Sequence, residues 1–129
     1  MDFDAIVDTA RMGMNKTGEF DLHKAVLSIP SWYFIAHGEG DDAEPMVGVV
    51  EGVPHVLAFT EEFRAAGYAD ILGRQRGSSA PPVLSMDVPE AMEYFAVLAQ
   101  HKVEGVAFNS GDYAFAVTFT QLNQVAKAR

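Results

Sequence analysis

The side chains in this sequence best suited to metal or acid–base chemistry are four histidines, His23, His37, His55 and His101. Their spacing matches no metal-binding motif such as HExxH, and the absence of cysteine excludes thiolate ligands and thiol catalysis. If the strands carrying His37 and His55 are neighbours, these two imidazoles could meet at a sheet edge, with Asp41 or Asp42 as a further ligand. We expect instead two surface histidines at strand ends and no bound metal.

A serine at position 110 lies in the short polar segment 109–112 (NSGD). Nucleophilic catalysis by serine needs a base and an orienting acid, and the GxSxG pattern of one large hydrolase class is absent. Asn109 and Gly111 both tolerate left-handed backbone, which is typical of a turn between strands. We therefore predict no catalytic residue here, and a turn that could present backbone groups to a partner.

The acidic segment 38–44 (GEGDDAE) contains four carboxylates in seven residues. A calcium loop needs oxygen ligands at alternate positions and a glutamate downstream, and this spacing does not fit. The segment is also too acidic to hold a phosphate, and the chain has neither GxGxxG nor a P-loop. We predict a solvated hairpin tip and no cofactor.

Composition favours one soluble domain. The 129 residues include 49% hydrophobic ones, enough for a single core. The net charge of −9 and the small basic group Arg74-Gln75-Arg76 argue against binding to nucleic acid or to an anionic membrane. No apolar run reaches the roughly 18 residues of a membrane span, and the acidic start is unlike a signal peptide. We expect a cytoplasmic protein.

Periodicity predicts an α+β (mixed α/β) fold, a single domain over residues 1–129 with one mainly antiparallel or mixed sheet of about five to six strands and helices packed on it. The predicted strands are 32–37, 46–51, 55–60, 83–86, 105–109 and 113–118. The first three should form an antiparallel meander, with 52–54 (GVP) as a tight connection. Segment 20–28 is ambiguous, and 73–82 is expected to be a surface loop.

Four helices are expected. Residues 1–18 should form an N-terminal amphipathic helix whose apolar positions are Phe3, Ile6, Val7, Ala10 and Met14. A second helix should begin at Thr60 as N-cap and bury Phe63, Ala66 and Ile71. A third should begin at Asp87, with Glu90 completing a capping box, and bury Ala91, Met92, Phe95, Leu98 and Ala99. Thr118 and Gln121 predict a further capping box, with Leu122, Val125 and Ala126 on the inner side of the last helix.

Three segments in order carry a family resemblance: the aromatic segment 32–35 (WYFI), 56–62 (VLAFTEE) and 106–111 (VAFNSG), followed by a closing helix from about residue 118. This run, over about residues 30 to 125, resembles the N-terminal domain of the bacterial enhanced-serine-sensitivity (SseB-type) family, with its "vFTse" and "lNPgs" segments. The chain has Ser110 where the family commonly has proline, and we expect it to lack a counterpart of the family's separate C-terminal domain. The family supplies no catalytic residue to transfer.

The resemblance and the missing catalytic motifs together predict a non-enzymatic accessory or protein-interaction module of bacterial type. Its partner is an unknown protein or a second copy, held through the N-terminal helix or a sheet edge. Trp and Tyr dominate interface hot spots, so the candidate contacts are Trp32, Tyr33, Asn109, Ser110, Gly111 and Tyr113. Strand alternation places Trp32 and Phe34 on one face and Tyr33 on the other, and helices could cover either face. The alternative function is a small-ligand-binding domain or weak enzyme, with a pocket near Trp32, His55 and Asn109.

Overall fold

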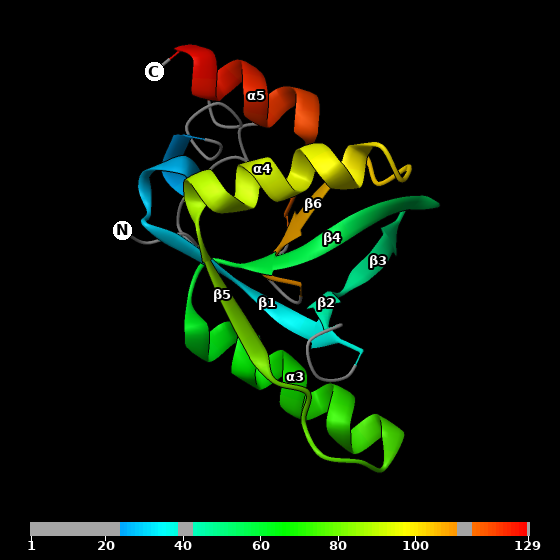
Figure 1. Cartoon of the computed structure of the whole chain (residues 1–129). Helices are drawn as coiled ribbons and strands as arrows, with labels where there is room; N and C mark the ends of the chain where they lie inside the picture. The colour runs from blue at the N-terminus through cyan, green and yellow to red at the C-terminus, as the bar shows by residue number, and fades with distance from the viewer. Residues whose placement is uncertain (1–23, 39–42, 111–114, 129) are drawn as a thin grey trace, which may run out of the picture.

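The computed structural model describes residues 24–38, 43–110 and 115–128. In these ranges the chain forms one open mixed sheet with helices on both faces, which confirms the predicted α+β class (Figure 1). The predicted N-terminal helix and the acidic residues 39–42 lie outside the described residues. Within the ambiguous segment 20–28, residues 24–28 are helical.

The elements follow the predicted order, with one strand more than expected. They are β1 (Ser31–His37), β2 (Glu44–Pro45), β3 (Val47–Val50), β4 (Val53–Phe59), α3 (Glu62–Arg76), β5 (Val83–Asp87), α4 (Val88–Ala99), β6 (Gly105–Phe108), β7 (Phe115–Thr118) and α5 (Phe119–Ala128). The added strand is the two-residue β2, which precedes the predicted strand 46–51.

The sheet is antiparallel except where β4 and β6 run parallel, with His55 to Ala58 paired to Gly105 to Phe108. On its other edge β4 pairs directly with β1 only at Tyr33–Phe59 and Phe34–Ala58. Beyond that point β2 and β3 separate the two strands, because the Met46 N–H donates to Ile35 O and Met46 O accepts from Leu57 N–H, at 2.8 and 2.9 Å. The predicted three-stranded meander is therefore modified: segment 44–50 lies between β1 and β4, paired with β1 through β2 and with β4 through β3. β5 pairs along the outer edge of β1, and β7 along β6.

The turn between β3 and β4 lies one step earlier than predicted. Glu51 and Gly52 form it with φ of 51° and 81°, the positive pair that a two-residue hairpin of type I′ needs. Val53 and Pro54 belong to β4, paired with Val50 and Val49. The expected connection 52–54 is thus corrected to 51–52, since right-handed strand twist favours the two-residue loop.

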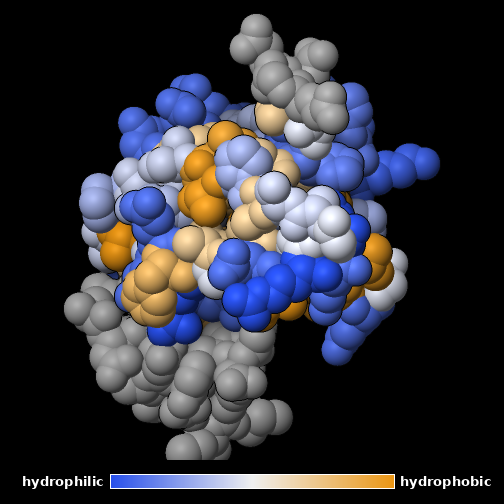
Figure 2. Space-filling view, turned by 90° about the horizontal axis from the view of Figure 1, so that it is seen from below, coloured by the Kyte–Doolittle hydropathy of each residue, from blue (hydrophilic) through white to orange (hydrophobic). Residues whose placement is uncertain are grey.

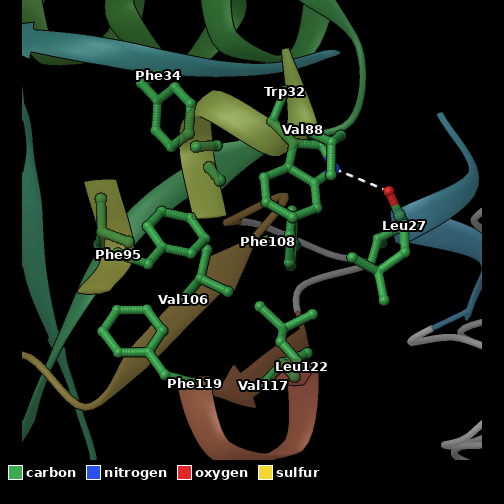
Figure 3. Packing of buried hydrophobic residues seen from close by; sticks show 14 of the residues in the cluster. Leu27, Trp32, Phe34, Val88, Phe95, Val106, Phe108, Val117, Phe119 and Leu122 are labelled. Atoms are coloured by element: carbon green, nitrogen blue, oxygen red, sulfur yellow. Dashed lines mark hydrogen bonds between the residues drawn. The ribbon is translucent and has the colours of Figure 1, made fainter. Parts of the chain in front are cut away.

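The larger core lies between the sheet and α4, α5 and the helical residues 24–28, and aromatic rings fill its centre (Figure 3). Phe95 stacks on Trp32 at 5.7 Å between ring centroids and on Phe119 at 5.0 Å. The Trp32 indole N–H donates to Val26 O at 2.9 Å, so burial leaves its polar atom satisfied. This face holds Trp32 and Phe34, as strand alternation predicted.

The predicted Asp87 N-cap of α4 and the predicted Thr118–Gln121 capping box of α5 are confirmed. Asp87 Oδ1 accepts from the Glu90 backbone N–H at 2.9 Å, at the start of α4. Thr118 and Gln121 exchange hydrogen bonds, Thr118 N–H to Gln121 Oε1 at 2.9 Å and Gln121 N–H to Thr118 Oγ1 at 3.0 Å. On α4 the inner face is Ala91 and Phe95, with Met92 and Leu98 half-buried, whereas Ala99 is exposed, contrary to expectation.

The opposite face of the sheet is covered by α3 (Figure 1). Its buried residues are Ala65, Ala69 and Gly73, and not the predicted Phe63, Ala66 and Ile71, all of which are exposed. The predicted cap is also wrong, because Glu61 occupies the N-cap without a side-chain hydrogen bond and Thr60 is engaged elsewhere. Ala65 and Ala69 pack against the sheet residues of the smaller core, whereas Gly73 makes room for the loop that follows α3, because a Cβ there would meet Ala80 N at 2.8 Å.

Candidate interaction surface

The outer side of α3 carries two large exposed apolar side chains one helical turn on either side of a glycine. Phe63 is 66% exposed and Ile71 is 54% exposed, and Gly67 lies midway between them. Residues four apart share a face of a helix, so the three form one line, which we call the α3 ridge. Figure 2, which views the molecule from the α3 side, shows hydrophobic side chains among hydrophilic ones across this face.

Packing against the sheet explains why the larger residues point outward. The inner side of α3 contacts Ile35, Leu57 and Phe59 through alanines, while Tyr68 packs beside Phe59 at 5.5 Å between ring centroids. Phe63 and Ile71 lie on the other side of the helix, and burying them would require α3 to rotate and expose its alanine face. The sequence did contain a signal for this surface, because α3 has two apolar stripes where a helix with one buried face needs one.

Packing among the described residues does not explain why position 67 of α3 is a glycine. A Cβ at this position would meet nothing within 4 Å, and its backbone is helical. Glycine inside a helix lowers stability by about 0.5–1 kcal/mol relative to alanine. The residue is therefore unfavourable for the isolated domain and leaves a gap in the α3 ridge.

Charges on α3 are divided between its ends. Glu61 and Glu62 are at the start, and Arg74 and Arg76 are in the last turn, an arrangement that complements the helix dipole. Two ion pairs run along the helix, Glu61 to Arg64 at 3.0 Å and the exposed Asp70 to Arg74 at 3.8 Å. These charges border the apolar ridge, as in a protein-binding surface with a polar rim.

Of the four predicted partner contacts that the structure describes, two are buried inside the domain and two are half-buried. Trp32 is fully buried and Asn109 is 4% exposed, which corrects the expectation that they present their side chains to a partner. Tyr33 and Ser110 are half-buried, with Tyr33 packed against the α3 side of the core. Gly111 and Tyr113 lie outside the described residues. Strand alternation could not tell which faces the helices cover.

Asn109 instead joins two strand ends that are far apart in the sequence. Its backbone N–H donates to Ala58 O at 2.8 Å, extending the parallel β4–β6 ladder. Its Oδ1 accepts from the Thr60 N–H at 3.0 Å, and its Nδ2 donates to Thr60 Oγ1 at 3.1 Å. The φ of 53° at Asn109 is one that asparagine tolerates better than most residues. Thr60 therefore bonds to Asn109 and does not cap α3.

Replacing Asn109 by alanine should lower the free energy of unfolding by about 2 kcal/mol, because a buried Thr60 N–H loses its acceptor and the left-handed backbone becomes less favourable. Urea denaturation followed by circular dichroism measures the loss. Ser110→Ala is the neighbouring control and should change stability by less than about 0.5 kcal/mol. Equal losses for both variants would contradict a structural role specific to Asn109.

The structure does not bring His37 and His55 together, and it does not place Trp32, His55 and Asn109 around one pocket. β2 and β3 lie between His37, which pairs with Glu44, and His55, which pairs with Gly48. His55 is buried, with Nδ1 2.9 Å from Val53 O, at the opposite end of β4 from Thr60 and Asn109. Within the described residues no three His, Asp or Glu side chains could jointly hold a metal ion. Trp32, on the α4 side of the sheet, does not share a site with His55.

A groove does occur between α4 and α5, and it is lined mainly by apolar atoms. Its residues are Met92, Phe95, Ala96, Ala99, Phe119, Leu122 and Asn123. Asn123 is the one polar side chain among them, whereas ligand pockets usually combine several convergent polar groups with an apolar wall. On α4, burial and secondly the negative charge of Glu44 raise the pKa of Tyr94 above its ordinary value.

Comparison with known proteins identified no relative of this chain. A scan against models of protein families found no match, and a search of curated proteins found no significant one. In the described part of the chain, no helix has both the length and the apolar character needed to cross a membrane.

Proposed function

We propose that this protein is a non-enzymatic accessory module of bacterial type that binds a protein partner through the α3 ridge. The observation that carries the proposal is the exposure of Phe63 and Ile71 on either side of Gly67. Exposed apolar clusters with a charged border are typical of protein-binding surfaces. The resemblance of segments 32–35, 56–62 and 106–111 to the SseB-type family supports an accessory role of this kind.

The geometry supports a docking module better than the alternative of a ligand-binding domain or weak enzyme. That alternative needs Trp32, His55 and Asn109 around one pocket, and these residues are buried in separate places. The α3 ridge, in contrast, combines an aromatic and an aliphatic side chain on one rigid helix. Large apolar side chains of this kind act as anchors at interfaces.

The α3 ridge can be tested with a double variant, Phe63→Ser with Ile71→Ser. Immobilised wild-type protein should retain a partner from a lysate of the source organism, and the double variant should lose at least about 90% of that signal, since loss of two anchors costs several kcal/mol of binding. Folding should be unaffected, because both side chains lie outside the core. Quantitative mass spectrometry of the retained proteins provides the measurement.

Val97→Ser is the matched control for this experiment, because Val97 is 51% exposed on α4, on the other side of the sheet. It should retain the partner at the wild-type level. Equal retention by the ridge variant and wild type would disprove the proposed surface. Turnover in a hydrolase and transferase screen that disappears in Ser110→Ala or His55→Ala protein would disprove the non-enzymatic part.

A further inference from the structure

We propose that the occupant of the α3 ridge is a second copy of this chain, paired with it through two antiparallel α3 helices that cross at Gly67. This inference rests on the proposed function and specifies its partner. It follows from the arrangement of α3 itself, which has the self-complementarity that a two-fold interface requires.

The apolar positions of the α3 ridge are symmetric about Gly67, with Phe63 four residues before it and Ile71 four residues after it. In an antiparallel pair with a two-fold axis at Gly67, Phe63 of each copy lies beside Ile71 of the other. The two-fold symmetry forms this Phe63–Ile71 contact twice, so that both exposed side chains of each copy are covered. A parallel pair would instead place phenylalanine against phenylalanine and like charges against each other.

The crossing of two helices gives a physical reason for the glycine at position 67. Small residues allow two helix backbones to approach closely, and no atom of the described residues would lie within 4 Å of a Cβ at Gly67. The two flanking side chains can then extend past the crossing point onto the partner helix. The loss of helix stability that glycine causes is offset only when a second backbone uses the gap.

Charge along α3 favours the same orientation. Arg64 and Asp70 flank the α3 ridge, each about 60° around the helix from Gly67, so an antiparallel pair centred on Gly67 brings Asp70 of each copy opposite Arg64 of the other. Antiparallel pairing also sets opposite ends of the helix dipoles side by side. Asp70 is exposed and its pair with Arg74 is long, at 3.8 Å, so its carboxylate can reach the guanidinium of the partner without breaking a buried contact.

Sedimentation equilibrium of the full chain, from about 10 µM to about 1 mM, tests the pairing. One pair of helices buries less area than a standard stable interface, so we expect a weak monomer–dimer equilibrium. Gly67→Gln should weaken association by at least about tenfold, or ~1.4 kcal/mol, because the longer side chain keeps the backbones apart. In dilute solution the same variant should melt about 2–5 °C higher than wild type, since glutamine favours helix over glycine.

Ala66→Gln is the matched control, because Ala66 is exposed on α3 but points about 90° away from Gly67 around the helix. It should leave the dimer unchanged. Charge reversal tests the orientation: Asp70→Arg and Arg64→Asp should each weaken the dimer roughly threefold to tenfold, and the double reversal should restore it. A parallel pair would not be rescued in this way.

The outcomes separate this inference from the function on which it rests. A chain that stays monomeric at about 1 mM, or a dimer that is insensitive to Gly67→Gln, overturns the antiparallel pairing. If the monomeric chain still loses a lysate partner when Phe63 and Ile71 are replaced, the ridge binds a different protein and the proposed function stands. If neither dimer nor ridge-dependent partner is found, both fail.

Discussion

Replacing Phe95 by alanine should lower the free energy of unfolding by about 3–5 kcal/mol. Phe95 is 3% exposed, and its ring contacts three aromatic side chains from β1 and α5. It stacks on Trp32 of β1 and on Phe119 of α5, and meets Phe34 edge-on at 6.3 Å between centroids. These neighbours belong to separate strands and helices, so they cannot collapse into the vacated space without moving the sheet or α5.

Urea denaturation, followed by tryptophan fluorescence and circular dichroism, measures this loss, because Trp32 is the only tryptophan and lies against the Phe95 ring. Val97→Ala, also on α4 but half-exposed, should cost less than about 1 kcal/mol. Phe95→Leu, which keeps most of the volume, should recover much of the Phe95→Ala loss. A Phe95→Ala loss below about 1.5 kcal/mol would show that α4 and α5 can repack.

The second large effect is expected from adding a single methyl group at Gly105, where β6 begins. A Cβ there would meet the Val117 carbonyl oxygen at 2.4 Å and Thr118 Cα at 3.0 Å. Both are backbone atoms of β7, so no side-chain rotation can relieve the clash. Gly105→Ala should therefore lower the free energy of unfolding by about 3 kcal/mol, through displacement of β7 and of α5 behind it.

Gly67→Ala is a control with the opposite sign, because its Cβ meets nothing within 4 Å and it should stabilise the monomer by about 0.5–1 kcal/mol. Thermal and urea unfolding of the two variants, with soluble yield as a second readout, give the comparison. If Gly105→Ala is as stable as wild type, the close approach of β6 and β7 at this point is not a requirement of the fold.

Local patterns were sufficient for the helices that begin at Asp87 and Thr118. Each cap depends on residues three apart, and the structure places the expected hydrogen bonds there. Strand alternation likewise assigned Trp32 and Tyr33 to opposite faces, since neighbouring strand residues always point apart. These features involve short stretches of chain whose geometry does not depend on distant segments.

Contacts between distant segments decided what the local patterns left open. The pairing of Thr60 with Asn109 joins residues 49 apart, and it removes Thr60 from the helix cap that its position suggested. The insertion of β2 and β3 between β1 and β4 is also non-local, because it depends on Met46 bonding to both Ile35 and Leu57. Neither contact has a periodic signature in the sequence.

The amino-acid sequence by itself determined the α+β class, most strand positions and the capped helices, because periodicity and capping act over a few residues. Only the tertiary structure decided which side of α3 is buried. Both sides are apolar, and hydrophobicity alone favours the larger Phe63 and Ile71 for the core. Close approach of α3 to the sheet instead selects Ala65 and Ala69, since dense packing depends on shape as well as on apolar area. The α3 ridge is exposed as a consequence of that choice.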